Sequence, residues 1–323
     1  MNYLIRGLLA AIAVLWIGAP LAQPAYPAKH IRFIATFPPG GSADLIARAL
    51  ATVLSDRLRQ QVLVENRPGA GGNIGMEFVA KAAPDGYTMG LGAAGALAAN
   101  VSLYPKMPFD PAKDFAPVSN VAFVPFFLVA KTALPANDLR ELIALASANP
   151  GQLMLGYGGN GTAMHLSGEL FKLMAKVQLT NVPYKGSGPA AMDVVSGQLD
   201  LAVVDVASAI GQVKAGRLRA IAVTSAKRVG VAPDVPTLAE AGLVGYEATG
   251  WFGVVMPAGT PPAIVGRMNA EIVAALKRQE MHERVLAAGA EPSPSTPEEF
   301  GALIREEIAK WAEVVKVSGA KPD

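Results

Sequence analysis

A short run rich in proline and glycine, Phe37–Asp44, separates an apolar segment from a strongly amphipathic one. The apolar segment, residues 31–37, has the length and composition of a buried β-strand. Pro39 disfavours a helix before it, and two glycines allow a tight turn with exposed backbone amides. The pattern predicts a strand, a glycine turn and a helix, with Ser42 as N-cap. The helix positions expected to face the core are Leu45, Ile46, Ala49, Leu50 and Val53.

A strand, a glycine turn and a helix start together can bind an anion, because unpaired amides converge there and the helix dipole favours negative charge. A second junction of this kind lies at Gly156–His165, where Thr162 is the predicted N-cap and Asn160 offers a polar side chain. One junction in each half of the chain could grip an anion from two sides. The alternative interpretation is two unrelated βα turns. Since Arg48 would point away from the core-facing stripe, backbone amides rather than an arginine would hold the charge.

Strand and helix patterns alternate along most of the 323 residues, a length that suggests two domains. Two extended apolar runs, Val118–Ala130 and Arg219–Thr224, could carry the chain from one domain to the other and back. The predicted fold class is α/β, with two lobes that each contain a mostly parallel sheet flanked by helices. Lobe 1 is predicted to comprise residues 27–121 and 227–323, and lobe 2 residues 122–226.

The N-terminus has the layout of a secretory signal peptide: Arg6, an apolar run over residues 7–18, then small residues and prolines. Residues 1–22 are therefore expected to direct export to the periplasm. The chain has no cysteine, so disulfides and a cysteine-linked lipid anchor are excluded. A net charge of +2 without a basic cluster argues against nucleic acid as a partner.

Sequence signatures of catalysis are missing. There is no G-x-S-x-G elbow, no H-E-x-x-H and no phosphate loop, and three widely spaced histidines do not suggest a metal site. We therefore expect a binding protein with no cofactor. Three single residues each have two interpretations. His165 lies near the cleft or makes a structural contact with Glu169. Asp205 contacts a ligand or caps a helix, and Trp251 lines the cleft or packs between the lobes. Lys185 follows a strand end and reads equally as a solvated charge.

Several motifs together resemble the Bug-type extracytoplasmic solute receptors of tripartite tricarboxylate transporters, over essentially the whole chain after the signal peptide. The motifs are Phe37–Arg48, Glu65–Gly75, Ala83–Thr88, Phe109–Pro111, Lys113–Val118, Val182–Gly186, Pro189–Ala190 and Pro257–Pro261. The resemblance implies a two-lobe Venus-flytrap receptor that delivers a small carboxylate to a membrane permease. We expect this receptor to be a monomer. The resemblance also implies that backbone amides of both lobes and a third loop, Gly92–Ala96, hold the ligand.

The residues predicted to bind the ligand, from the junctions and the resemblance together, are Pro38, Pro39, Gly40, Gly41, Ser42, Ala93, Gly95, Asn160, Gly161, Thr162, His165 and Asp205. The third loop has alanines where many relatives carry Ser or Thr, which leaves the identity of the carboxylate open. A receptor that signals to a membrane sensor is the alternative function, and a periplasmic enzyme on a similar scaffold is a more distant one.

Overall fold

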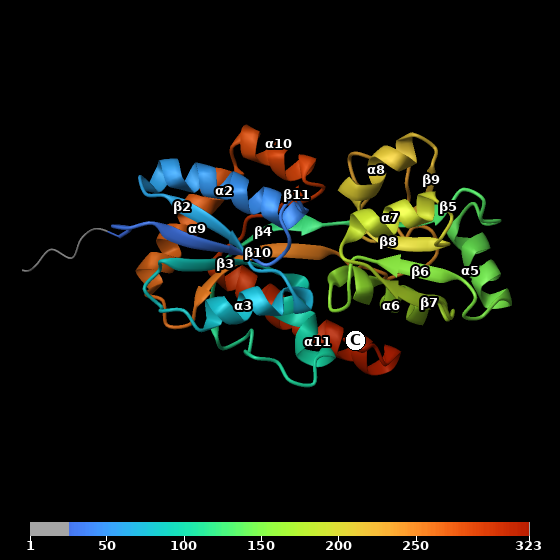
Figure 1. The fold of residues 1–323 in the computed structure, drawn as a ribbon, viewed down its shortest axis with the longest axis horizontal. Coiled ribbons are helices and arrows are strands. Elements are labelled where there is room, and N and C mark those ends of the chain that lie inside the picture. The colour runs from blue at the N-terminus through green and yellow to red at the C-terminus, as the bar shows by residue number, and fades with distance from the viewer. Residues whose placement is uncertain (1–25, 323) are drawn as a thin grey trace, which may run out of the picture.

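The computed structural model describes residues 26–322, so the predicted signal peptide lies outside the described residues. Two α/β lobes lie side by side (Figure 1). The first contains a six-stranded sheet in the order β11-β4-β10-β3-β1-β2. Its strands are β1 (Ile31–Ala35), β2 (Val62–Asn66), β3 (Thr88–Ala93), β4 (Phe115–Val124), β10 (Gly250–Pro257) and β11 (Glu291–Pro292).

The second lobe is built on a five-stranded sheet in the order β7-β6-β8-β5-β9. Its strands are β5 (Phe126–Lys131), β6 (Met154–Tyr157), β7 (Thr180–Pro183), β8 (Leu201–Asp205) and β9 (Leu218–Val223). The predicted α/β class with two lobes is therefore confirmed. Both sheets are mixed rather than mostly parallel, because β10 runs antiparallel to β3 and β4, and β5 runs antiparallel to β8 and β9.

The predicted crossing at residues 118–130 is a pair of strands in different sheets. Pro125 separates β4 from β5, at a position where the missing N–H removes a donor from either sheet ladder. The second predicted crossing, Arg219–Thr224, does not return the chain, since β9 pairs with β5 in the second sheet. The segment after it stays with the second lobe: Thr237 bridges to Val223, and Tyr246 hydrogen-bonds Ser167. We therefore propose that the chain returns near Gly250, later than the domain division predicted from sequence.

Helices cover both faces of each sheet. In Figure 1, α2 and α10 lie on one side of the first sheet and α3 and α11 on the other, while α7 and α8 lie opposite α5 and α6 in the second lobe. The helices are α2 (Ser42–Leu58), α3 (Asn73–Ala80), α4 (Asn100–Leu103), α5 (Leu139–Ala148), α6 (Ala163–Ala175), α7 (Ser187–Val195), α8 (Val206–Lys214), α9 (Pro262–Leu276), α10 (Gln279–Ala287) and α11 (Pro297–Ser318). A 3₁₀ turn at Ala70–Gly72 and a π-helical turn at Gly95–Ala99 complete the first lobe.

Near the C-terminus the sequence pattern predicts one helix over residues 261–279 and another over residues 296–317. The first is α9, which ends at Leu276, and α10 follows it as a helix that was not predicted. The second is α11, which begins after Thr296 with the expected proline and acidic first turn. Thr296 and Glu299 form a capping box, each side chain accepting the other residue's N–H. The last helix contacts β4 in the first lobe and α6 in the second, so it packs across the boundary between them.

Candidate ligand-binding cavity

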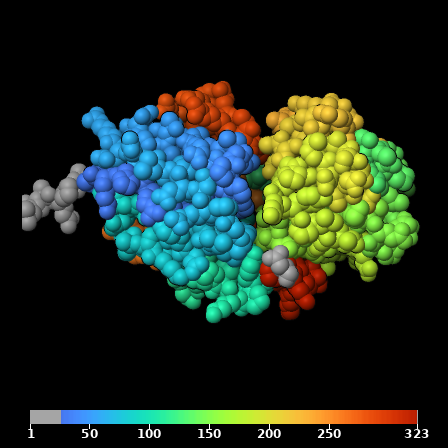
Figure 2. All heavy atoms as spheres, in the orientation of Figure 1, coloured from blue at the N-terminus to red at the C-terminus, as the bar shows by residue number. Residues whose placement is uncertain are grey.

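A cavity of about 500 Å³ lies between the two lobes, where the space-filling view is hollowed (Figure 2). First-lobe loops that follow β1 and β3 form one wall, and second-lobe loops that follow β6, β7 and β8 form the opposite wall. These are the carboxyl ends of parallel strands, where open α/β sheets place their binding crevices. The fold therefore creates the site by bringing two such edges face to face.

Most of the residues predicted to bind a ligand line this cavity. They are Pro38, Pro39, Gly40, Gly41, Ser42, Ala93, Gly95, Thr162 and Asp205. Gly161 instead lies where the two lobes touch, beside Gly95 and Gly71. Asn160 and His165 line a separate hollow of about 320 Å³ behind the loop. Contact between any of these residues and a ligand stays a prediction.

The cavity is surrounded by helix N-termini from both lobes. The N-cap residues of α2, α6, α7 and α8 all line it, and these residues are Gly41, Thr162, Gly186 and Asp205. The first-turn amides of a helix have no partner within the helix, and each N-terminus carries a partial positive charge. The wall of the cavity therefore favours a negatively charged ligand.

Only two of these N-termini are capped by side chains. Thr162 accepts the His165 backbone N–H at 3.3 Å, as predicted, and Asp205 accepts the Ser208 N–H at 2.8 Å, so its role as a helix cap is confirmed. Gly41 and Gly186 have no side chain to offer, and the amides of α2 and α7 stay available to a ligand. The prediction that Ser42 caps α2 is wrong, because Ser42 is already the first helical residue.

The buried carboxylate of Asp44 replaces a cap at this helix and shapes the glycine turn. Asp44 Oδ2 accepts the Gly40 N–H at 3.0 Å, while Oδ1 accepts Asn66 Nδ2 at 2.8 Å and lies 2.9 Å from Arg48 Nε. Burial acts to raise the pKa of Asp44, but the hydrogen bonds from Arg48, Gly40 and Asn66 outweigh it and lower that pKa. Arg48 points away from the core, as expected, and is engaged by Asp44 rather than by the cavity.

We expect the Asp44 contacts to make stability depend on pH in acid. Because the folded-state pKa lies below the ordinary value of about 3.9, this stabilisation is complete above that value and is lost as the pH falls through the folded-state pKa. Asp44→Asn should lower the free energy of unfolding by about 2 kcal/mol at pH 7, and the difference from wild type should shrink below pH 4. Denaturant unfolding of both proteins between pH 3 and 7 measures it. A difference that stays constant across this range would contradict the assignment.

The remaining walls are largely apolar. Leu45, predicted to face the core, is 49% exposed and lines the cavity, because it lies on the exposed face of α2 that also carries Arg48, three residues later. Trp251 is 1% exposed, forms part of the wall and donates its indole N–H to Glu307, so it both packs and borders the cleft. Among the described lining residues the charged side chains are Lys185 and Asp205.

Sequence reasoning undervalued the loop after β7. Residues 185–189 line the cavity from the second lobe, and α7 begins there without a side-chain cap. The signal was present in the sequence, since Tyr184–Gly188 is a further strand, glycine and helix junction. It lacked a polar N-cap, which made it look less like a site than the loop at 158–162.

Glycines allow the lobes to approach closely on both sides of the cavity. A Cβ atom at residue 95 would lie 2.3 Å from the Gly161 carbonyl oxygen, and one at residue 71 would lie 2.9 Å from it. On the other flank, a Cβ atom at Gly289 would lie 2.5 Å from that of Ala207 in α8. These contacts leave no room for a side chain, so the structure is a closed arrangement of the lobes.

Comparison with known proteins identifies the family. The sequence profile described as "Tripartite tricarboxylate transporter family receptor" matches residues 46–320. The chain belongs to this receptor family. It is 41% identical to Protein BugT of Bordetella pertussis over 311 residues, which is 96% of this chain and 95% of that protein.

Solved structures of similar proteins share the fold. An R. palustris protein with adipate matches with a TM-score of 0.85 at 38% identity, covering 92% of this chain and all of that one. MatC from Rhodopseudomonas palustris with bound malate matches with a TM-score of 0.81 at 34% identity, covering 90% of this chain and all of that one. Residues 26–322 contain no helix long and apolar enough to cross a membrane. The same residues contain no group of three or more His, Asp or Glu placed to hold a metal ion.

Proposed function

We propose that this receptor captures a small organic carboxylate in the cavity between its lobes and delivers it to the permease of a tripartite tricarboxylate transporter. The observation that carries the proposal is the convergence of four helix N-termini from both lobes on one cavity. Two of them have no side-chain cap, so their amides can donate charge-assisted hydrogen bonds to a carboxylate. Carboxylates in the adipate and malate structures support the same ligand class.

We further propose that the receptor acts as a monomer in the periplasm after removal of residues 1–22, and that it binds without chemical conversion of the ligand. Closure would follow from binding, because a ligand held by both walls stabilises the closed arrangement over an open one. The apolar side chains around the rest of the cavity would contact the carbon skeleton of the acid.

Recovery of the bound acid tests the proposal directly. The protein is exported in its native host, purified gently and denatured, and the released small molecules are identified by mass spectrometry. We expect an intact carboxylic acid in stoichiometric amount, and adding it back should raise the melting temperature and reduce the radius of gyration. Release of a non-acidic compound, or conversion of the added acid, would refute the proposal.

Two substitutions distinguish backbone from side-chain recognition of the carboxylate. Gly41 has a φ of −80°, and the Pro38 carbonyl oxygen is the sole neighbour within 4 Å of a Cβ atom there, so valine would fold without strain and occupy cavity space. We expect Gly41→Val to weaken binding more than about 100-fold, given about 1.5–3 kcal/mol for each charge-assisted bond lost. Lys185 is exposed, and we expect Lys185→Ala to weaken binding about fivefold or less. Titration calorimetry with the recovered acid measures both, and the reverse order would show that the lysine holds the ligand.

A further inference from the structure

Gly161 is the residue at which the loop before α6 meets the opposite lobe. Its carbonyl oxygen lies against Gly95 and Gly71, as the distances to their hypothetical Cβ atoms show. Its Cα faces the first lobe as well, since a Cβ atom there would lie 2.8 Å from Asn100 Oδ1 and 3.1 Å from the Tyr104 ring. The position of this residue therefore determines how closely the second lobe can approach the first.

The other side of Gly161 is held by a histidine of its own lobe. The Gly161 N–H points at Nδ1 of His165, a residue in the first turn of α6, at 3.4 Å. His165 is 2% exposed, and its ring stacks on Tyr157 with centroids 4.7 Å apart and an interplanar angle of 20°. Burial and the stack on Tyr157 thus restrict the ring plane, so that the acceptor nitrogen stays aimed at the loop.

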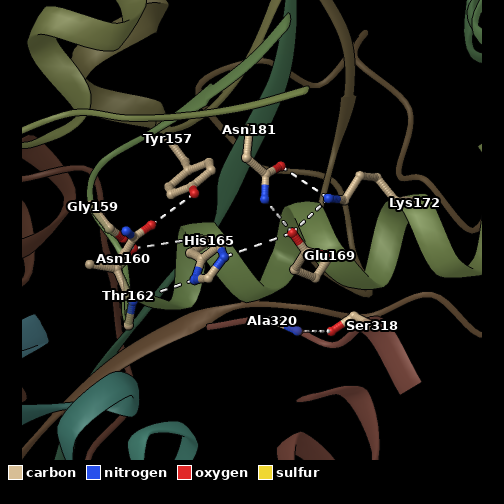
Figure 3. Close-up of polar contacts among 11 residues, drawn as sticks. Tyr157, Gly159, Asn160, Thr162, His165, Glu169, Lys172, Asn181, Ser318 and Ala320 are labelled. Atoms are coloured by element: carbon tan, nitrogen blue, oxygen red, sulfur yellow. Dashed lines mark hydrogen bonds and ion pairs between the residues drawn. The ribbon is translucent and has the colours of Figure 1, made fainter. Parts of the chain in front are cut away.

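Charged and polar groups surround the far edge of the ring. His165 Nε2 lies 3.8 Å from Oε1 of the buried Glu169, and that oxygen also receives Lys172 Nζ at 2.7 Å and Asn181 Nδ2 at 2.6 Å (Figure 3). Lys321, in the tail that follows the end of α11, lines the same hollow. An N–H donated to Nδ1 requires the proton of the neutral ring to reside on Nε2, which faces Glu169.

We propose that His165 is a positioning residue for ligand capture: it holds the Gly161 loop where its carbonyl meets the first lobe and where Thr162 faces the cavity. The effect on ligand capture rests on the proposed binding function, whereas the contact between His165 and the Gly161 N–H does not. A protonated ring has an N–H at both nitrogens, so it cannot accept the Gly161 N–H. Protonation of His165 therefore releases the loop, and closure becomes weaker in acid.

Amide exchange at Gly161 tests the geometry without any ligand. In ¹⁵N-labelled protein, Gly161 exchange is measured by NMR between pH 5 and 8 for wild type, His165→Ala and His165→Asn. The asparagine side chain presents an amide oxygen in place of Nδ1 and does not titrate. Ser167→Ala is the matched control, because it removes a buried hydrogen bond from the same helix to Tyr246, away from the loop.

Each Gly161 exchange rate is first divided by the intrinsic rate at that pH. We then expect the rate in His165→Ala to be at least tenfold higher than in wild type. The rate in His165→Asn should lie near the wild-type rate, and the rate in Ser167→Ala should equal it. In wild type the protection should fall as the histidine protonates, and in His165→Asn it should not. Equal protection in wild type and His165→Ala overturns the proposal. So does a wild-type Gly161 amide that exchanges at its intrinsic rate, a result that stands even if the alanine variant fails to fold.

Calorimetry with adipate as the named probe tests the consequence for binding. We expect affinity to fall about tenfold in His165→Ala, to be restored in His165→Asn, and to decline in acid for wild type alone. The positioning role is overturned if wild type binds adipate and its affinity equals that of both variants and does not change with pH. If wild type binds neither adipate nor any acid recovered from the native host, the proposed function fails, and the Gly161 exchange data still decide the role of His165.

Discussion

Gly95→Ala is expected to weaken binding of the recovered acid about 10- to 100-fold while leaving the melting temperature of the ligand-free protein unchanged. The added methyl group would lie 2.3 Å from the Gly161 carbonyl oxygen, which is a backbone atom and cannot rotate away. Overpacking of this kind costs about 1–3 kcal/mol. The clash with Gly161 exists only when the lobes are closed, whereas the contact within the first lobe, 3.3 Å from the Gly71 carbonyl oxygen, is far milder, so the substitution penalises capture more than folding.

Calorimetry and solution scattering measure this effect. In scattering, the variant should remain larger than wild type at a concentration of acid that saturates wild type. Gly266→Ala on α9 is the matched control, since a Cβ atom there meets nothing within 4 Å. Wild-type affinity and compaction in Gly95→Ala would mean that the ligand-bound lobes are further apart than in this structure.

Glu307→Ala is expected to produce a large loss of stability, about 3 kcal/mol in the free energy of unfolding. Glu307 is 9% exposed, and its Oε2 accepts the indole N–H groups of Trp251 at 3.3 Å and Trp311 at 2.8 Å. Removing the carboxylate leaves two buried donors without this partner, and each orphaned group costs about 1–3 kcal/mol. The carboxylate links α11 to the strand that borders the cavity.

Denaturant unfolding followed by tryptophan fluorescence measures the loss, because both indoles report on the same contact. Glu306→Ala, at the adjacent exposed position of α11, is the control and should change stability by no more than about 0.5 kcal/mol. An equal effect of the two substitutions would show that the indole contacts contribute little and that helix propensity dominates.

Much of the local structure could be predicted from the sequence. The junction predicted at Gly156–His165 is present, with β6 ending at Tyr157 and α6 beginning after the N-cap Thr162, because apolar periodicity, glycines and an N-cap threonine all agree there. Predictions failed where a long-range contact competed with a local preference. Ser42 is a good N-cap residue by composition, yet Asp44 and its distant partner Asn66 organise that turn instead.

The α/β class, the two lobes, most elements, the glycine junctions and the family could be predicted from the amino-acid sequence, because these depend on local periodicity, turn chemistry and motif spacing. The folded chain was needed to show which junctions face one cavity, that the 185–189 loop joins them, and that His165 lies behind the loop at Gly161. Those facts depend on how strands distant in sequence are ordered within two mixed sheets and on how closely glycines let the lobes approach. No local pattern encodes either quantity, since both arise from contacts between residues far apart in the chain.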